Sequence, residues 1–171
     1  MSENLKLVPT QQVSTLSATL AWFNEARPAP TNKQFHTQTG VHFEEVGEMI
    51  DEISGLNTYA DVLLGNARVA LRALADYLKA ESHVITVKPE DRIDFLDALS
   101  DQIVTATGVG QHLKFLMVEA MDEVNASNFS KFVDGKAIYT DPVSQKIGKG
   151  PDYFKASLGA FVPARSPALD D

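Results

Sequence analysis

The sequence predicts an all-α protein, and three observations favour this class. Apolar residues recur at spacings of three and four along most of the chain up to residue 125, which is the period of a helix that buries one face. The chain has 171 residues, enough to enclose one hydrophobic core. No internal repeat or long linker divides it. We therefore expect one domain over residues 1–171: a bundle of four to five helices, a long irregular C-terminal segment, and frayed tails at 1–9 and 163–171.

The first two predicted helices are separated by a proline-rich break. The first covers residues 9–26, and Arg-Pro-Ala-Pro at 27–30 ends it because proline cannot continue the hydrogen-bond ladder. The second covers residues 34–54, and Gly55 follows at a usual stop position. The apolar face of this second helix consists of Phe43, Val46, Ile50 and Ile53.

The third predicted helix, at 58–79, is the most apolar of the set. Thr58 and Asp61 resemble a capping box at its start. A short β-prone connector at 83–87 follows.

The fourth predicted helix begins at Lys88-Pro89-Glu90-Asp91, where proline and acids suit a helix N-terminus. It ends near Thr107, since Gly108 and Gly110 loosen the chain, and a fifth helix runs to about Asn125. Beyond that point, residues 127–158 are rich in Gly, Ser, Lys, Asp and Pro without a sustained period. In that stretch Asp134-Gly135 predicts a turn, which would join two short extended pieces.

Composition excludes several classes of protein. The net charge of −8 argues against broad nucleic-acid binding, which needs Lys and Arg to neutralise phosphates. The absence of cysteine excludes disulfides, thiolate catalysis and zinc–thiolate sites, and it fits a reducing compartment. No run of consecutive apolar residues approaches the length of about 18 that a membrane span needs. Residues 1–9 lack the pattern of a secretory signal, so we expect a cytoplasmic protein.

The second predicted helix carries five acids on the face opposite its apolar stripe: Glu44, Glu45, Glu48, Asp51 and Glu52. Glu48 lies one turn from both Glu44 and Glu45, at spacings of four and three. Taken alone, this pattern is also typical of a solvated acidic face.

The fourth predicted helix adds Asp94, Asp97 and Asp101 within roughly 60° of one another. Aspartate is a poor helix former, and no Lys or Arg lies three or four residues from Asp97 or Asp101. Two helices with uncompensated carboxylates favour a divalent-cation site, and Mg²⁺ prefers such oxygen ligands. The histidines provide no zinc set; His36 and His42 flank Gln38, and we interpret His42 as an ordinary polar histidine.

The C-terminal segment concentrates lysine in an acidic protein. It holds five of the 15 basic residues: Lys131, Lys136, Lys146, Lys149 and Lys155. Lysine is a compact point charge suited to phosphate, and Gly148 and Gly150 permit close backbone approach. The G-x-x-x-x-G-K-[ST] loop is absent. By composition alone, a phosphate-binding segment and a flexible solvated loop are equally compatible with this stretch.

Three sets of residues, in this order, resemble the motifs of one family. His42 to Glu48 reads H-F-E-E-V-G-E and fits an E-E-x-x-E helix. Asp97 to Asp101 reads D-A-L-S-D and stands where the family has its E-x-x-D helix. The third set is S-N-F-S-K at 127–131, D-G-K at 134–136 and K-G-P-D-Y at 149–153. The family is the all-α NTP pyrophosphohydrolase superfamily, which includes MazG, phosphoribosyl-ATP pyrophosphohydrolase and the all-α dUTPases. Over residues 31–158 the chain resembles most the MazG-like proteins often encoded by bacteriophages.

The resemblance implies a metal site built from acidic side chains. The implied ligands of Mg²⁺, with Mn²⁺ as a possible substitute, are Glu45, Glu48, Asp97 and Asp101. The implied catalytic carboxylates are Glu44, Glu45 and Glu48. The chain departs from the family pattern at Ala98, where E-x-x-D would place its first acid, and Asp97 is the nearest substitute.

The resemblance also implies an activity and partners. Family members cleave an NTP or dNTP between the α- and β-phosphates, and they assemble as dimers or tetramers. Lys131 and Lys149 would stabilise charge on the leaving pyrophosphate, and Asn128 and Tyr153 would join them in binding substrate. The alternatives are a non-enzymatic acidic helical oligomer with a binding or regulatory role, and an enzyme for another diphosphate such as phosphoribosyl-ATP.

Overall fold

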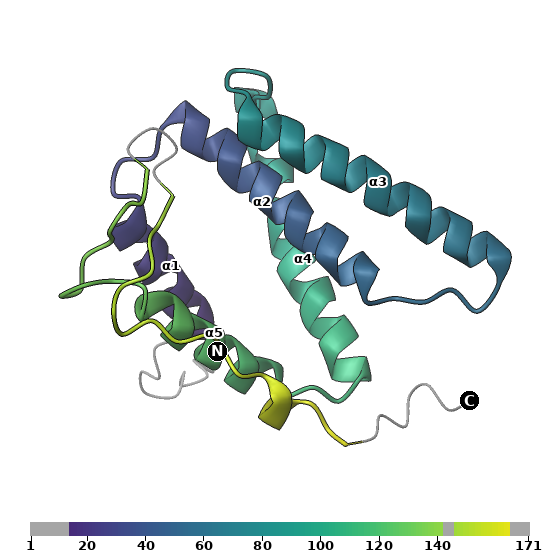
Figure 1. Cartoon of the computed structure of the whole chain (residues 1–171). Helices are drawn as coiled ribbons and strands as arrows, with labels where there is room; N and C mark the ends of the chain where they lie inside the picture. The colour runs from purple at the N-terminus through teal and green to yellow at the C-terminus, as the bar shows by residue number, and fades with distance from the viewer. Residues whose placement is uncertain (1–13, 142–145, 165–171) are drawn as a thin grey trace, which may run out of the picture. The chain divides into compact units, whose positions relative to one another are not determined.

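The computed structural model describes residues 14–141 and 146–164 (Figure 1). Within these ranges the chain is all-helical and forms no β-strand, which confirms the predicted class. The helices are α1 (Thr15–Ala26), α2 (Asn32–Asp51), α3 (Thr58–Ala80), α4 (Arg92–His112) and α5 (Met117–Phe129), with 3₁₀ turns η1 (Pro89–Asp91) and η2 (Gly159–Phe161). The described residues fall into two units: residues 29–95 form one, and residues 14–28 with 96–164 form the other. The tail expected at 1–9 and most of the tail at 163–171 lie outside the described residues.

The unit of residues 29–95 is a hairpin of α2 and α3 (Figure 1). The helices approach closely at Gly40, where an added Cβ would lie 2.8 Å from the Ala75 carbonyl oxygen and 3.2 Å from Leu78 Cβ. Ala75 and Leu78 are buried against this contact. A glycine in the middle of α2 costs helix propensity. At this position it allows two helix backbones to pack at short range.

Side chains at the helix starts define the bounds of the hairpin. Thr31 and Gln34 form a reciprocal capping box at the start of α2. The predicted capping box at Thr58 and Asp61 is wrong, because the Asn57 side chain caps α3 by accepting from the Ala60 N–H at 2.9 Å. Asp61 instead accepts from the Gly55 N–H at 2.9 Å and thereby fixes the loop before α3.

The C-terminal end of α3 is held by α2. The Lys33 ammonium donates to the carbonyls of Lys79, Ala80 and Glu81 at 2.7–2.8 Å, which satisfies acceptors that the end of a helix leaves open. The connector at 83–87, which the sequence marks as β-prone, forms no strand. Its first amides bind side chains of α2 instead of a neighbouring strand.

The second unit is built on the packing of α1 against α5. Asn125 is buried between them; its amide donates to the Thr15 carbonyl at 3.0 Å and its Oδ1 accepts from Thr19 Oγ1 at 2.9 Å. The Trp22 indole donates to the Asn128 carbonyl at 2.9 Å. These contacts join residues more than 100 positions apart in the sequence, so α1 and the C-terminal third of the chain fold together.

Two predicted helix ends differ from the structure. The fourth helix does not stop near Thr107 but continues as α4 to His112. A glycine weakens a helix without removing a hydrogen bond, so Gly108 and Gly110 are accommodated. The Gly110 position also leaves room for the Met117 side chain, which lies where a Cβ would be. The fifth helix runs beyond Asn125 to Phe129, so the start of the S-N-F-S-K motif is helical.

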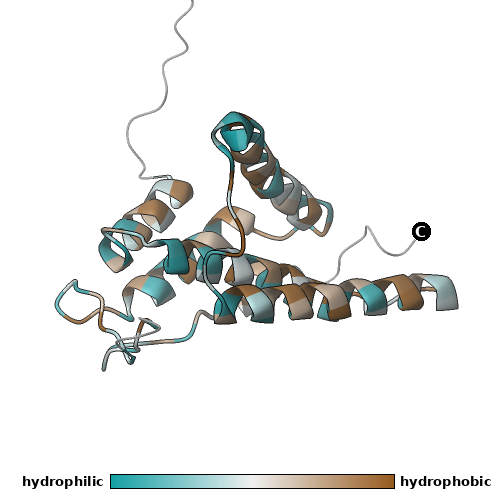
Figure 2. Ribbon diagram, turned by 90° about the horizontal axis from the view of Figure 1, so that it is seen from above, coloured by the Kyte–Doolittle hydropathy of each residue, from teal (hydrophilic) through white to brown (hydrophobic). Residues whose placement is uncertain are grey.

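The helices carry apolar and polar residues side by side along their length (Figure 2). Within the described part of the chain, no helix combines the length and hydropathy needed to cross a membrane.

Candidate functional site

The E-E-x-x-E helix contributes to a pocket on one face of the α2–α3 hairpin. The pocket has a volume of about 220 Å³ and is lined by Glu44, Glu48, Arg72, Ala75, Asp76 and Lys79. Glu44 and Glu48 are four residues apart, and the three charged α3 residues follow one another at spacings of four and three. These spacings bring each set to one face of its helix. The pocket therefore combines carboxylates and cations from two helices.

Lys79 is the centre of the charge pairs in this pocket. Its Nζ lies 2.7 Å from Glu44 Oε1 and 3.2 Å from Asp76 Oδ1. The pKa of Lys79 is raised, mainly because Glu44 accepts a hydrogen bond from the ammonium group, with a smaller contribution from Asp76. The side chains of Lys79 and Glu44 are 27% and 42% exposed, so water screens the pair and its contribution to stability is small.

The acids of α2 are partly compensated by bases of α3, which corrects the prediction that this helix carries uncompensated carboxylates. Besides the Lys79–Glu44 pair, Asp51 forms ion pairs with Arg68 and, at 2.9 Å, with Arg72. The prediction considered only bases on the same helix. The bases that pair with these acids could have been found in the sequence. Arg68, Arg72 and Lys79 follow one another at spacings of four and seven and so lie along one face of α3.

Glu45 and Glu48, the predicted metal ligands on α2, are both exposed. Glu48 lines the pocket and has no ion pair among the described residues. Glu45 is not among the residues that line it. Of the three predicted catalytic acids, the hairpin thus brings Glu44 and Glu48 to one pocket.

The other two predicted ligands, Asp97 and Asp101, lie one turn apart on α4 and are exposed. They have no ion pair with any described residue. They belong to the unit that contains α5, whereas α2 belongs to the hairpin unit. In the parts of the chain that the structure describes, no three Asp, Glu or His side chains converge as a metal site. Glu48 and Asp101 each carry the hard oxygen donors that Mg²⁺ prefers.

The S-N-F-S-K motif is built into the contact between α1 and α5. Lys131 Nζ donates to Asn128 Oδ1 at 2.7 Å and lies 5.6 Å from the centre of the Trp22 ring. The Phe132 ring stacks on the Trp22 ring, with their centroids 5.9 Å apart. Two predicted substrate-binding residues, Asn128 and Lys131, are thus neighbours that also contact a tryptophan. The sequence reasoning missed Trp22, because no motif or spacing links it to this segment.

The serines of the same motif hold the end of the segment. Ser127 Oγ donates to the Phe154 carbonyl at 2.8 Å, and Ser130 Oγ accepts from the Phe154 N–H at 3.1 Å. Gly150 donates from its N–H to the Lys131 carbonyl at 3.0 Å, and a Cβ there would lie 3.1 Å from that same oxygen. The K-G-P-D-Y stretch is therefore fixed against the end of α5, and its glycine is required by the close backbone approach.

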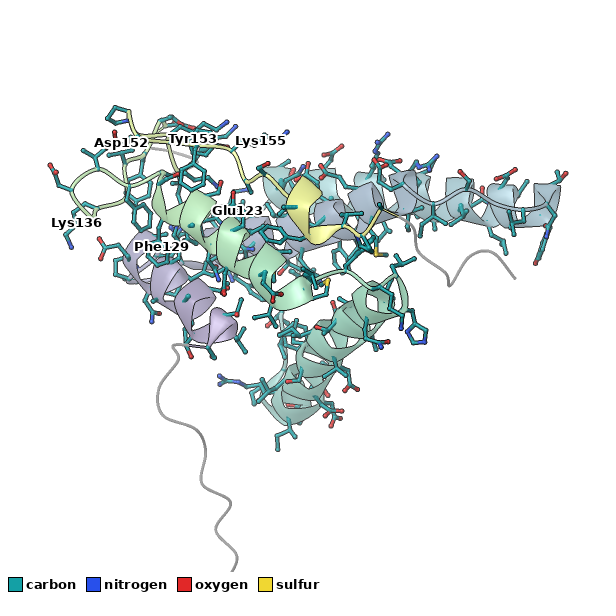
Figure 3. All side chains as sticks on the ribbon, turned by 90° about the horizontal axis from the view of Figure 1, so that it is seen from below. Glu123, Phe129, Lys136, Asp152, Tyr153 and Lys155 are labelled. Carbon is teal, nitrogen blue, oxygen red and sulfur yellow. The ribbon has the colours of Figure 1, made fainter. Side chains whose placement is uncertain are left out.

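Lys149 and Tyr153 form the second neighbouring pair among the predicted substrate-binding residues. Lys149 Nζ lies 4.5 Å from the centre of the Tyr153 ring, within the range of a cation–π contact. Figure 3 shows Tyr153 between Asp152 and Lys155 on the stretch that runs beside α5. Lys149 is exposed, so its ammonium can reach solvent or a ligand.

The predicted turn at Asp134-Gly135 is confirmed. Both residues have positive φ, 49° and 73°, and Val133 and Lys136 exchange backbone hydrogen bonds at 2.9 Å across them. Lys136 forms an ion pair with Glu25 of α1 at 3.1 Å. The described part of the segment thus folds onto its neighbours through specific contacts, which a solvated loop would not require.

Comparison of the chain with protein-family models, with curated proteins and with solved structures finds no match. The resemblance to the all-α NTP pyrophosphohydrolases accordingly rests on the three sets of sequence motifs.

Proposed function

We propose that this chain is a Mg²⁺-dependent nucleoside triphosphate pyrophosphohydrolase that converts an NTP or dNTP to the monophosphate and pyrophosphate. The observation that supports the proposal most is the pocket in which Glu44 and Glu48 of the E-E-x-x-E motif lie beside Arg72 and Lys79. A phosphate-cleaving site needs carboxylates that accept protons and hold cations, and it needs positive charge near the phosphates. Both kinds of group are present on one face of the hairpin.

The acidic residues divide into two roles in this proposal. The metal ligands that the resemblance implies are Glu45 and Glu48 of α2 and Asp97 and Asp101 of α4. Mg²⁺ held there would neutralise phosphate charge and favour the activation of a water molecule. Glu44 orients the attacking water, and a neighbouring carboxylate accepts its proton. The Lys79 ion pair fixes the Glu44 carboxylate for this role.

The C-terminal segment supplies the groups that recognise the triphosphate. Lys149 is exposed, and Lys131 is oriented by its hydrogen bond to Asn128 and by Trp22. We assign both ammonium groups to the charge that develops on the leaving pyrophosphate. Tyr153 provides an aromatic face beside Lys149. The amide of Asn128 adds a neutral donor.

The proposal includes a homo-oligomer, a dimer or tetramer. Large apolar side chains on α3 and α4 are exposed in the single chain; Tyr59 is 73% exposed and Ile93 is 80% exposed. Others of this kind are Val62, Leu63, Val69, Tyr77, Leu96, Ile103 and Val104. So many exposed large apolar side chains on α3 and on α4 favour a protein interface. A second copy of the chain is a partner that would cover them without any other component.

The experiment that tests the function is a panel of NTPs and dNTPs incubated with the protein and Mg²⁺, with pyrophosphate release as the readout. We expect release for at least one triphosphate, its loss in excess EDTA, and its recovery with Mg²⁺ or Mn²⁺. We also expect Mg²⁺ to raise the unfolding temperature, because a ligand of the folded state stabilises it. Full activity in excess EDTA would contradict the metal requirement.

A second candidate function is a non-enzymatic acidic oligomer with a binding or regulatory role. The exposed apolar faces of α3 and α4 favour it, because a docking protein needs such surfaces. The same panel separates the two functions: a docking protein releases no pyrophosphate from any triphosphate.

A further inference from the structure

His36 is a fully buried polar side chain whose contacts define its protonation. It is 0% exposed, and its Nδ1 lies 2.9 Å from the Asn32 carbonyl oxygen in the preceding turn of α2. Its Nε2 receives the backbone N–H groups of Val84 at 2.9 Å and Ile85 at 3.0 Å. A carbonyl only accepts and an amide N–H only donates, so Nδ1 carries the proton and Nε2 is a bare acceptor. The ring is therefore neutral in this arrangement.

We infer that His36 is an acid-sensitive latch that holds the connector between α3 and α4 onto α2. A proton on Nε2 would turn the acceptor of two amides into a donor that faces two other donors. It would also place a charge in a fully buried position. Both effects oppose the latched form, so proton uptake releases Val84 and Ile85.

The charged groups around the ring do not offset this effect. The titratable residues nearest to these contacts are Lys33 of α2, Lys79 and Glu81 at the end of α3, His83 of the connector, and Asp91 and Asp94, which line a groove together with Ile85. Lys33 binds the carbonyls at the end of α3 rather than the ring. His83, whose ring centroid is 6.5 Å away, is exposed. Glu81 takes part through its backbone carbonyl, and no carboxylate among the described residues forms a hydrogen bond or ion pair with the His36 ring that would favour its charged form.

The latch controls the shape of a groove on the hairpin unit. The connector residues Ile85, Thr86 and Val87 line a groove of about 480 Å³, which Phe35 of α2 also lines. His36 follows Phe35 directly, so the latch lies where the connector meets α2. Release of the connector removes this part of the groove's lining and frees the segment that leads into α4. This inference is independent of the proposed catalytic activity.

The test is an NMR measurement on the full chain between pH 8 and pH 5. Long-range ¹H–¹⁵N spectra report which ring nitrogen of His36 carries the proton. Amide exchange gives the protection factors of Val84 and Ile85 relative to their intrinsic rates. We expect the Nδ1–H tautomer at pH 8. The released form binds a proton that the latched form excludes, so protection should fall with decreasing pH, by up to ~10-fold per pH unit for one linked proton. Protection of Leu71 in α3 should fall much less.

Two variants make the assignment specific. His36→Gln keeps an oxygen acceptor but cannot take up a proton in this range, so the protection of Val84 and Ile85 should become independent of pH. His83→Gln, at the exposed neighbouring histidine, should keep the wild-type pH dependence. The inference is overturned if wild-type protection stays constant from pH 8 to pH 5, if His36 carries its proton on Nε2 at pH 8, or if His83→Gln abolishes the dependence. If His36→Gln does not fold, the wild-type tautomer and protection profile decide alone.

Discussion

The pocket on the α2–α3 hairpin and the C-terminal segment both contain motif residues, but they use them differently. In the pocket, Glu44 is paired with a half-exposed lysine, and Glu48 has no ion pair among the described residues. In the segment, Ser127, Ser130 and Asn128 all make hydrogen bonds that hold the chain in place. In the pocket Glu48 therefore has no ion pair with a described residue to break before it binds a ligand, whereas the polar groups of the segment first serve the fold.

Because of this difference, substitutions in the two regions should affect activity and stability differently. A change at Glu48 should alter activity and leave stability nearly unchanged, because this side chain is exposed and has no ion pair with a described residue. A change in the S-N-F-S-K stretch should alter both, because a lost hydrogen bond at a packed contact costs about 1 kcal/mol.

The largest expected effect is that of Glu48→Gln. The substitution keeps the size of the side chain and removes its charge, so activity should fall at least ~100-fold, on the scale of a lost catalytic group. Asp101→Asn on α4 should have the same effect, and circular dichroism should show unchanged helix content in both. Glu52→Gln, at another exposed acid at the end of α2, is the matched control and should retain activity. Near-normal turnover of Glu48→Gln would place the site elsewhere.

The next effect concerns the packing of the hairpin. Gly40→Ala places a Cβ 2.8 Å from the Ala75 carbonyl oxygen, so the helices must separate, and unfolding in urea should show a loss of about 1–3 kcal/mol. Gly65→Ala in α3 meets nothing within 4 Å and should stabilise the chain by up to about 1 kcal/mol through helix propensity. Equal effects of the two substitutions would contradict the close approach at Gly40.

Lys131→Ala and Lys149→Ala compare, within the segment, a lysine that packs on Trp22 with one that is exposed. Both should lower kcat/KM for triphosphates roughly 10-fold, since each removes an ammonium from the leaving pyrophosphate. The inhibition constant of the monophosphate should change much less. Only Lys131→Ala should also lower stability, by about 1 kcal/mol, because it loses the bond to Asn128 and the contact with Trp22. Equal weakening for triphosphate and monophosphate would indicate contacts to the base or sugar.

The smallest effect is a pH dependence at Lys79. Its pKa is raised in the folded chain by Glu44, so its contribution to stability is fully present below the ordinary value of 10.5 and is lost as pH rises through the raised value. Glu44→Gln should therefore cost up to about 1 kcal/mol at pH 8–9 and progressively less above pH 10.5. Urea unfolding of wild type and variant at several pH values checks this. A difference that is constant up to pH 12 would contradict the pair.

Much of the fold could be predicted from the sequence because helix periodicity and breakers are local signals. The existence of all five helices followed from apolar spacing, and the break at 27–30 followed from proline. The features that were predicted wrongly are details of where helices begin and end, which depend on small differences between neighbouring residues. Asn57 rather than Thr58 caps α3, and α4 passes through Gly108 and Gly110.

Less of the candidate site could be predicted. The E-E-x-x-E spacing identified Glu44 and Glu48, which share a pocket. The partners of these acids lie on α3, and a search for bases limited to one helix misses them. Trp22 lies more than 100 residues from the lysine it contacts, and no local pattern predicts such a pairing.

The most direct test of the central claim is the identity of the products formed from a nucleoside triphosphate with Mg²⁺. ³¹P NMR of the reaction follows every phosphorus species at once. The account predicts that the nucleoside monophosphate and pyrophosphate appear in equal amounts and at equal rates, with no nucleoside diphosphate and no orthophosphate. Formation of the diphosphate and orthophosphate, or the absence of turnover with every NTP and dNTP, would contradict it.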